Sequence, residues 1–340
     1  YLSEKYPMVE LENNVMINAS VIPSKDLVEQ IKSLKHNQAI FYNEVLIAFF
    51  SLSDVETIDF ELFYKINLNE EPIIIKNTWD IFSNNGIALQ RDYEKITEGR
   101  KSLPIPDSVN VVNPEQIFIE EGAILNFVTI NASKGPVYIG KNSEIMEGSI
   151  IRGPLALCEG AVLKLGTKIY GPTTVGPYSK VGGEVNNSVI SGYSNKGHDG
   201  FLGNSVIGEW CNLGADTNTS NLKNNYAEVR LWDYESGRFA STGLQFCGLM
   251  MGDHSKCAIN TMFNTGTVVG VCANIFGSGF PRNFIPSFSW GGSQGFTTYL
   301  TSKAFEVAKI VMSRRNIELT EQDEYILTTI FNQTEAFRKS

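Results

Sequence analysis

The sequence predicts a mixed α/β segment at the N-terminus, a parallel β-helix in the middle and a helical tail. Three observations lead to this fold class. Aliphatic residues recur every six positions through the middle of the chain, strand and helix patterns alternate before it, and helical patterns follow it. We place the boundaries at 1–102, 103–280 and 281–340, because "SLPIPD" at 102–107 carries two prolines in a short span.

The first segment reads as alternating strands and helices. "NNVMINASVIP" is strand-like, and "SKDLVEQIKSL" predicts a helix that begins after Ser24 as N-cap and places Leu27 and Ile31 on one face. "QAIFYNEVLIAFF" predicts a hairpin that turns at Asn43-Glu44. The chain opens on Tyr1 and enters sheet-like sequence directly, so we expect that some N-terminal sequence is missing.

The middle segment carries a repeat of six residues. Small residues mostly stand two positions before each repeated aliphatic, and glycine or proline follows several of them by three positions. This period predicts a parallel β-helix in which each repeat forms one short strand and one corner, and about eighteen residues form a triangular coil. The repeated positions are Ile139, Ile145, Ile151, Leu157, Leu163, Ile169, Val175 and Val181.

The repeat is interrupted twice, at about 185–203 and at 219–246. We expect these interruptions to be loops that leave the stack, and such loops usually carry function. The first contains "SNKGHDGFLG" at 194–203, where His198 lies among glycines. The Gly-rich break is therefore predicted to lift His198 out of the coil.

The tail begins with a loop rich in glycine and aromatic residues and continues as two helices. Ala304, Val307, Ala308 and Val311 fall on one helical face, and Thr320 begins the second helix with a capping-box pattern. We expect these helices to cap the end of the β-helix or to form a subunit contact, rather than to act in catalysis.

Composition excludes several classes of function. The net charge is −9 and the basic residues form no cluster beyond pairs such as Arg314-Arg315, so nucleic acid is not an expected partner. A run of about 18 apolar residues is absent, so no membrane span is expected. The five cysteines fit neither a zinc site nor a disulfide framework, so we expect no metal there and buried free thiols in a reducing cytoplasm.

Four short stretches carry a resemblance to a known family. "GEVNN" (183–187), "NKGHDGFLG" (195–203), "NLGADT" (212–217) and "SNL" (220–222) fall where the GlmU family has V-E-x-K-K, K-A-x-H-x-x-Y-x-G, N-I-G-A-G-T and C-N-Y. The chain resembles this bifunctional family over essentially its whole length, and best resembles the divergent branch associated with the Bacteroidetes. In this family a Rossmann-like sugar-1-phosphate uridylyltransferase precedes a left-handed β-helix that N-acetylates glucosamine-1-phosphate.

The resemblance carries over to individual residues. His198 falls on the catalytic histidine, with Glu184 fourteen residues before it and Asn212 fourteen after it. Asn221 falls on the asparagine of C-N-Y, and Lys164 in "LKLG" replaces a phosphate-binding arginine. It also implies a cytoplasmic homotrimer that serves UDP-N-acetylglucosamine synthesis for the cell envelope.

Three positions depart from the family pattern. Asn186 and Asn187 replace the lysines of V-E-x-K-K, and Phe201 replaces the tyrosine three residues after the histidine. These positions would hold the sugar phosphate, so its charge needs another partner. The candidates are Lys164, Lys196, Lys180 and Arg152.

The residues suit N-acetyl transfer from a thioester. Imidazole has an unperturbed pKa of about 6.5, which fits a general base, and Glu184 is a candidate to orient it. The Asn212 side chain or backbone N–H groups of the Gly-rich loop would stabilise the oxyanion. The resemblance implies that acetyl-CoA lies near the residues Ala258, Asn260, Thr261 and Gly277, with Arg282 toward its phosphates.

The first segment is less complete as an active site. Nucleotidyl transfer needs a Gly-rich phosphate loop and carboxylates for Mg²⁺, and this chain has no such loop. Asn18 stands where related enzymes carry a metal-binding Asp; Asp26 and Asp80 are nearby acids that equally fit helix caps. The resemblance implies Mg²⁺ and UTP for the complete protein.

Two alternatives to acetyl transfer remain open. In the first, the chain is a nucleotidyltransferase whose β-helix only assembles the oligomer. In the second, it is a regulatory subunit in which both halves are degenerate. A pure scaffold has no need of His198 and Glu184, whereas the missing lysines and Asn18 favour the regulatory subunit.

Overall fold

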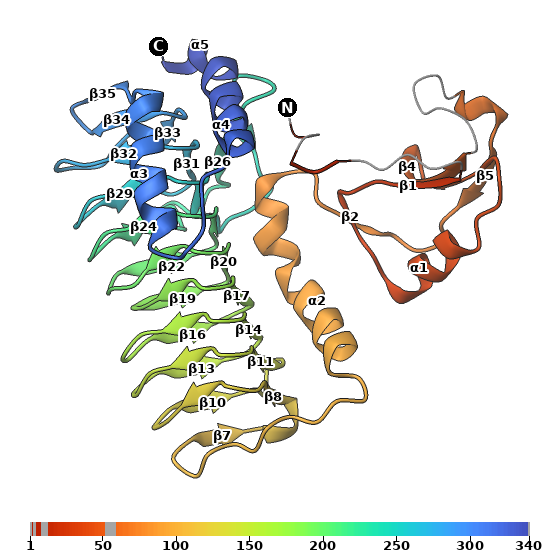
Figure 1. Ribbon diagram of the computed structural model, residues 1–340, viewed down its shortest axis with the longest axis horizontal. Helices are drawn as coiled ribbons and strands as arrows, with labels where there is room; N and C mark the ends of the chain where they lie inside the picture. The colour runs from red at the N-terminus through yellow and green to blue at the C-terminus, as the bar shows by residue number, and fades with distance from the viewer. Residues whose placement is uncertain (1, 3–4, 8–12, 52–58, 339–340) are drawn as a thin grey trace. The chain divides into compact units, whose positions relative to one another are not determined.

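The computed structural model describes residues 2, 5–7, 13–51 and 59–338, so Tyr1 lies outside the described residues. The chain divides into two compact units, Leu2–Asp80 and Ile81–Ser340 (Figure 1). We describe each unit by itself.

The first unit is a mixed sheet with one helix. The predicted strand, helix and hairpin are confirmed, and the Leu27 N–H donates to the Ser24 Oγ at 3.2 Å, as expected of an N-cap. Leu27, Ile40 and Ile47 lie in its core. Its sheet has the order β1-β4-β3-β5, and its elements are β1 (Asn14–Ile17), β2 (Val21–Ile22), α1 (Lys25–Lys32), β3 (Gln38–Tyr42), β4 (Val45–Ser51), η2 (Phe60–Leu62), β5 (Tyr64–Asn67) and β6 (Ile73–Ile74).

Helix α2 (Thr78–Thr97) is not among the elements predicted above. At its start, the Asp80 carboxylate accepts hydrogen bonds from the backbone N–H groups of Lys76 and Asn77, at 2.9 and 2.7 Å. Asp80 therefore caps a helix, which is one of the two roles that its position allowed.

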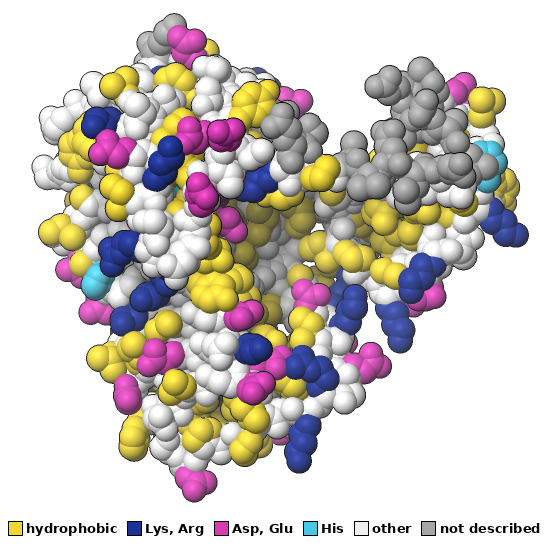
Figure 2. Space-filling model, in the orientation of Figure 1, with side chains coloured by type: hydrophobic (Ala, Val, Ile, Leu, Met, Phe, Trp, Pro, Cys, Tyr) yellow, Lys and Arg dark blue, Asp and Glu magenta, His cyan; other side chains and the backbone are white. Residues whose placement is uncertain are grey.

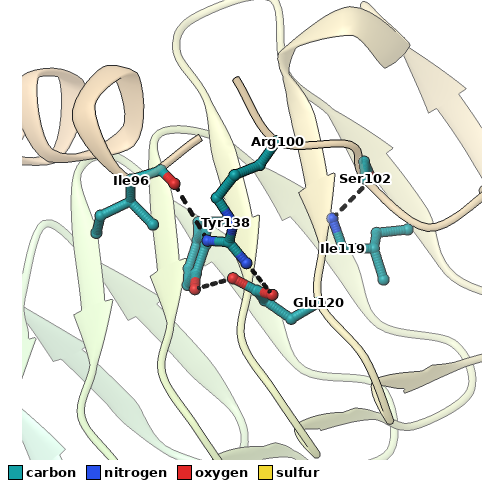
Figure 3. A network of polar contacts seen from close by, with 6 residues as sticks. All are labelled: Ile96, Arg100, Ser102, Ile119, Glu120 and Tyr138. Atoms are coloured by element: carbon teal, nitrogen blue, oxygen red, sulfur yellow. Dashed lines mark hydrogen bonds and ion pairs between the residues drawn. The ribbon is translucent and has the colours of Figure 1, made fainter. Parts of the chain in front are cut away.

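A polar network fixes the chain that follows α2. Arg100 donates to the Glu120 carboxylate at 2.6 Å and to the Ile96 carbonyl at 3.1 Å, and the Tyr138 hydroxyl donates to Glu120 at 2.6 Å (Figure 3). Burial raises the pKa of Glu120, but the hydrogen bonds from Arg100 and Tyr138 outweigh it, so the net pKa is lowered. The network joins the C-terminal end of α2 to the first coils of the β-helix.

The second unit is a parallel β-helix with hexapeptide repeats, as the six-residue period predicts, and of the left-handed type that the resemblance implies. Three sheets form its three faces, and the coils stack from β7 upward in Figure 1. A short helix, η3 (Pro114–Gln116), lies in the first coil. Face 1 contains β7 (Asn110–Val112), β10 (Thr129–Asn131), β13 (Ile150–Arg152), β16 (Lys168–Tyr170), β19 (Glu184–Asn186) and β22 (Phe201–Gly203), and β25 (Asn218–Thr219) pairs with β30 (Met262–Phe263) in the coils beyond.

Faces 2 and 3 run through the whole stack. Face 2 contains β8 (Ile117–Ile119), β11 (Val137–Ile139), β14 (Leu155–Leu157), β17 (Thr173–Val175), β20 (Val189–Ile190), β23 (Val206–Ile207), β28 (Leu249–Met251), β31 (Thr267–Val269) and β33 (Phe284–Ile285). Face 3 contains β9 (Ile124–Leu125), β12 (Glu144–Ile145), β15 (Val162–Leu163), β18 (Lys180–Val181), β21 (Asn195–Lys196), β24 (Asn212–Leu213), β29 (Lys256–Cys257), β32 (Asn274–Ile275), β34 (Ser289–Gly292) and β35 (Gly295–Thr298).

The six-residue period places the core correctly. All eight repeated aliphatic residues are at most 1% exposed, and small residues such as Ser143 and Thr167 are fully buried beside the corners. The Thr167 hydroxyl donates to the Lys164 carbonyl at 2.6 Å, so the small polar residues close the corners. Four of the five free cysteines are buried, as predicted.

The first predicted break does not leave the stack. Strands β19 to β22 pair in register with the coils on either side, so the expectation of a loop at 185–203 is wrong. Leu157 pairs with Val175, eighteen positions later, whereas Val181 pairs with Lys196, only fifteen positions later. The corners of this coil are shorter, which moves the inward positions out of the six-residue register while the fold continues.

The second predicted break is a loop that leaves the stack. It carries a hairpin of β26 (Arg230–Asp233) and β27 (Arg238–Ser241). The Trp232 ring stacks on Phe284 of the last coils with 4.1 Å between centroids, and its edge contacts Phe337 near the C-terminus. The insertion is therefore packed onto the β-helix by aromatic contacts.

The C-terminal helices cover an edge of the stack. Helix α3 (Thr301–Ser313) buries Ala304 and Ala308 of the predicted face, α4 (Glu321–Gln333) begins with the predicted Thr320 capping box, and α5 (Glu335–Arg338) ends the described chain. They pack on Trp210, Cys272 and Phe288, at the edge where face 2 meets face 3. Figure 1 shows α3 alongside the upper coils, so it covers a side of the stack.

The visible surface carries charges of both signs, and acidic and basic side chains are interspersed on the face shown in Figure 2. No helix within the described residues has an apolar stretch long enough to cross a membrane.

Candidate functional site

The predicted site residues gather along the edge where face 3 turns into face 1, which we call the 3–1 edge. Backbone hydrogen bonds stack its corners on successive coils. The Asp216 N–H donates to the Asp199 carbonyl at 3.1 Å, and the Asn260 N–H donates to the Ala215 carbonyl at 2.8 Å. The corners that contain His198 and Asn260 are thus separated by one coil.

His198 lies exposed at its corner of this edge. The corner passes directly over Gly183 of the coil below, where an added Cβ would come within 2.9 Å of the His198 carbonyl oxygen. Only a glycine therefore allows the two coils to approach so closely. The imidazole reaches solvent from within the regular stack, because the short corner below it leaves no side chain in its way.

Lys196 points into the interior of the coil and is only 2% exposed. Its ammonium donates to the carbonyl oxygens of His198 at 2.8 Å and of Gly182 at 3.0 Å. Burial lowers the pKa of Lys196 to about 8. The expectation that Lys196 contacts a sugar phosphate does not fit this placement, because its charged group faces the core.

Glu184 begins β19 on the coil below His198, half-buried on face 1. The Tyr170 hydroxyl donates to its carboxylate at 2.6 Å. Burial and this hydrogen bond raise the pKa of Tyr170 to about 12, so the phenol remains a donor at neutral pH. Tyr170 is absent from the predicted site, although it stands fourteen residues before Glu184, about one coil away.

Phe201 and Asn221 come together on face 1, next to Asn186. A Cβ added to Gly203, which pairs with Asn186, would lie 2.6 Å from both the Phe201 ring and the Asn221 amide nitrogen. The Asn221 amide also donates to the Asn204 side chain at 2.8 Å. These predicted acceptor residues therefore surround one glycine, and Phe201 pairs directly with Glu184 on the coil above it.

Asn212 and Lys164 lie farther along the same edge, whereas Arg282 lies two residues before the face 2 strand β33, away from this edge. Asn212 is exposed on face 3, where it pairs with Asn195, three positions before His198. Lys164 lies two coils below the His198 corner. Its N–H donates to the Val181 carbonyl of the next coil, and the Gly182 N–H of that coil donates to the Lys196 carbonyl of the coil that carries His198. Arg282 is exposed in the segment between β32 and β33.

A cleft of about 570 Å³ adjoins Asn186 at the edge where face 1 turns into face 2, the opposite end of face 1 from the 3–1 edge. Lys134 and Arg152 line it together with Tyr170 and Gln90 of helix α2. Arg152 and Asn186 lie in one outward row, with Tyr170 between them. This cleft places two cationic side chains beside the position where the family motif has lysine.

The predicted acetyl-CoA residues lie on the coils above His198. Ala258 and Asn260 form one corner and Gly277 the next, where a Cβ on Gly277 would meet no atom within 4 Å. Thr261 is 4% exposed and its hydroxyl donates to the Ala258 carbonyl at 2.7 Å, so its side chain serves the corner. Apolar side chains exposed on these coils are Ile259, Met262, Phe276 and Phe280.

The first unit offers no metal site in the part of the chain that the structure describes, where no group of three or more His, Cys, Asp or Glu side chains is gathered. The Asn18 amide donates to the Leu46 carbonyl at 2.9 Å, and its oxygen accepts from the Ser20 N–H and hydroxyl. Asn18 and Asp80 are thus both engaged by backbone groups. The described residues do not fit the Mg²⁺ that the resemblance implies.

Comparisons with known proteins bear on both units. Residues 1–101 match the family model described as sugar nucleotidyl transferase. The chain is 32% identical to a bifunctional sugar-1-phosphate nucleotidylyltransferase/acetyltransferase of Sulfurisphaera tokodaii, over 57% of this chain and 55% of that protein. It is 33% identical to the bifunctional protein GlmU of Methanocaldococcus jannaschii, over 56% of this chain and 40% of that protein.

The chain thus spans about half the length of the curated relatives it matches. Among solved structures, the polySia-specific acetyltransferase NeuO aligns with 58% of this chain and 81% of its own, at 12% identity and a TM-score of 0.32. The Sulfurisphaera tokodaii relative is named as a transferase of both kinds, and the resemblance predicted from the sequence is confirmed. The chain is similar to bifunctional GlmU-type proteins: residues 1–101 match a sugar nucleotidyl transferase family model, and a hexapeptide-repeat β-helix follows them.

Proposed function

We propose that the β-helix transfers an acetyl group from acetyl-CoA to the amine of an amino-sugar phosphate, with glucosamine-1-phosphate as the acceptor. The observation that carries the proposal is the position of His198. It is exposed on the same edge as the corners that contain Ala258, Asn260 and Gly277, and Glu184 lies one coil below it.

The chemistry assigns one role to each of these groups. The His198 imidazole removes a proton from the acceptor amine as the amine nitrogen attacks the thioester carbonyl. The new C–N bond forms, the C–S bond breaks, and the proton passes from the imidazolium to the leaving CoA thiolate. Glu184 stabilises the imidazolium, and the Asn212 amide or a backbone N–H stabilises the oxyanion.

The acceptor binds on face 1 over Glu184, where Asn186, Phe201 and Asn221 form the surface for the sugar. Lys164 on the 3–1 edge, with Arg152 and Lys134 in the adjoining cleft, supplies positive charge for the phosphate in place of the missing lysines. The pantetheine arm packs along the exposed apolar side chains of Ile259 and Phe276.

The complete protein couples this step to uridylyl transfer from UTP and forms UDP-N-acetylglucosamine. Support comes from the match of residues 1–101 to sugar nucleotidyl transferases and from a bifunctional relative that is named for both activities. We further propose that the protein is a cytoplasmic homotrimer. The cytoplasmic location fits a reaction that uses acetyl-CoA, and it also fits the five cysteines that remain free thiols. The alternative is a nucleotidyltransferase whose β-helix is only a scaffold.

The test is thiol release from acetyl-CoA with glucosamine-1-phosphate, measured for wild type, His198→Ala and His36→Ala. We expect kcat of His198→Ala to fall by at least a hundredfold, because a general base contributes about 10²- to 10⁴-fold. His36 is an exposed histidine of the first unit, so His36→Ala serves as a matched control that keeps the rate. A rate that survives in His198→Ala would contradict the assigned base, and UTP turnover without acetyl transfer would favour the scaffold.

A further inference from the structure

One inward position of the β-helix holds a charged residue. The inward positions of face 3 are otherwise apolar and buried, and they form a continuous row through the stack. Lys196 interrupts this row, only 2% exposed. The row otherwise contains Leu125, Ile145, Leu163, Val181, Leu213, Cys257 and Ile275.

A lysine is costly at such a position. Burying an ammonium group requires compensating hydrogen bonds, whereas a leucine or methionine would fill the same space without that cost. The ammonium of Lys196 has carbonyl partners on two coils, Gly182 below and His198 in its own corner, at 3.0 and 2.8 Å. The hydrogen bond to the His198 carbonyl connects the interior of the coil directly to the corner that carries the imidazole.

Backbone hydrogen bonds hold the two ends of that corner, where the Gly182 N–H donates to the Lys196 carbonyl at 2.7 Å and the Glu184 N–H donates to the Gly200 carbonyl at 3.2 Å. Gly197 has open space where a Cβ would lie, and Gly200 has a φ of +116°, so glycines flank the segment on both sides. The Asp216 N–H anchors the carbonyl of Asp199, one peptide farther on. Lys196 anchors the carbonyl of His198 from inside the coil, so the two bonds together fix consecutive peptide planes.

We propose that Lys196 is a positioning residue, which holds the His198 corner, and hence the imidazole, in place through the His198 carbonyl oxygen. The catalytic consequence rests on the proposed function of His198. A lysine that merely fills space predicts a different result, because removing a buried ammonium then leaves both the corner and the rate unchanged. In the positioning role, Lys196→Met leaves the protein at least as stable as wild type while kcat falls.

The experiment compares the intact protein with Lys196→Met and with a matched control, Lys256→Met. Lys256 is a half-buried lysine of face 3, and its ammonium donates to the carbonyl of His254, two residues away, at 2.8 Å. Amide hydrogen exchange of the peptide 194–203 and the steady-state kcat and KM are measured for all three. Lys196→Leu serves as a second variant, since leucine already occupies this row at other coils.

In Lys196→Met we expect exchange of the Phe201 N–H, which donates to the Asn218 side chain at the end of this corner, to rise at least tenfold and kcat to fall ten- to a hundredfold. KM for both substrates should stay within about threefold, and thermal unfolding should not move downward. Lys256→Met should keep wild-type exchange at 194–203 and wild-type kcat. Unchanged exchange in Lys196→Met and Lys196→Leu would overturn the proposal, and so would faster exchange with an unchanged kcat. If wild type transfers no acetyl group, the proposed function fails, and the exchange measurement alone decides whether Lys196 holds the corner.

Discussion

At the scale of single residues, the Glu184 carboxylate has two roles in the proposed site. The Glu184 carboxylate accepts a 2.6 Å hydrogen bond from the Tyr170 hydroxyl on the coil below, and in the proposed reaction it also stabilises the imidazolium of His198. The Tyr170 bond orients Glu184 without neutralising it, because a phenol whose pKa is about 12 keeps its proton. Tyr170 therefore acts through Glu184 rather than on the substrate.

Substitution of the two residues should separate these roles. We expect Glu184→Gln to lower kcat about 10- to 100-fold, because an amide cannot stabilise the imidazolium by charge. Tyr170→Phe should lower kcat by less, about three- to tenfold, since the charge remains and only its orientation is lost. Steady-state rates of acetyl transfer check this order. Equal losses in both variants would mean that Tyr170 contacts the acceptor itself.

The buried Lys196 should also leave a signature in the pH dependence of stability. Burial lowers its folded pKa to about 8 from the ordinary 10.5, although the charges of Asp199, Asp216 and Cys257 act against this shift. Between these values the unfolded chain holds a proton that the folded chain lacks, so this site adds stability as pH rises, and its cost is fully present below pH 8. The free energy of unfolding of Lys196→Met minus that of wild type should be largest at pH 7 and shrink by up to about 3 kcal/mol near pH 10.5.

Chemical denaturation of both proteins at pH 7 and pH 9.5 measures this difference. The tyrosines and the buried cysteines other than Cys257, which interacts with Lys196, also titrate in that range, but they are common to both proteins and cancel in the difference. A difference independent of pH would contradict the lowered pKa of Lys196.

At the scale of elements, aromatic residues join the C-terminal helices to the β-helix. Tyr178, Tyr193 and Trp210 occupy one corner position on successive coils, all with φ near +58°, and the Tyr193 and Trp210 rings stack at 4.3 Å. Lower in the stack the same corner holds Asn142, a residue that accepts positive φ readily. Aromatic residues replace it toward the coils where α3 and α4 pack, so helix contact outweighs the backbone cost.

We expect Trp210→Ala to destabilise the second unit by about 3–5 kcal/mol, which is typical of removing a buried aromatic side chain. The 6% exposed Trp210 ring contacts the helical cluster, so protection of α3 amides against exchange should fall more than that of the lower coils. Thermal unfolding and hydrogen exchange measure the two effects. Uniform loss of protection along the stack would show that the helices are not held through this corner.

At the scale of the whole molecule, the sequence predicts those features that repeat. A period of six identifies an inward row, because each coil offers its neighbour the same surface. The coil around His198 does not follow this pattern, because its corners are shorter and its inward position is Lys196, a residue that no apolar pattern detects. Helix α2 is not predicted, for another reason. Gly86 and several polar residues interrupt its apolar face, and only Phe82, Asn85 and Leu89 are buried.

The residues of the candidate site likewise divide into those that follow the spacing of the coils and those that do not. The fourteen-residue spacings place Glu184, His198 and Asn212 on neighbouring coils, because they are close to the length of the coils here. The bond from Tyr170 to Glu184 and the cleft with Arg152 depend on which side chains face outward across coils. That arrangement requires the exact register, which the sequence alone places wrongly at 185–203.

The two units should also be separable in solution. The second unit has its own continuous core from Val109 to Ile285, and each coil contacts chiefly its neighbours, so its stability is a sum of local interfaces. We expect a fragment of residues 78–340, which retains all of α2, to show the same acetyl-transfer rate per chain as the 340-residue protein. Its denaturant transition should superimpose on the later of two transitions of the longer chain, because the first unit has a much smaller core. Circular dichroism through a guanidinium titration, with thiol release measured on the same samples, checks both expectations. A fragment that folds but loses the rate would mean that the first unit contributes to the acetyl-transfer site.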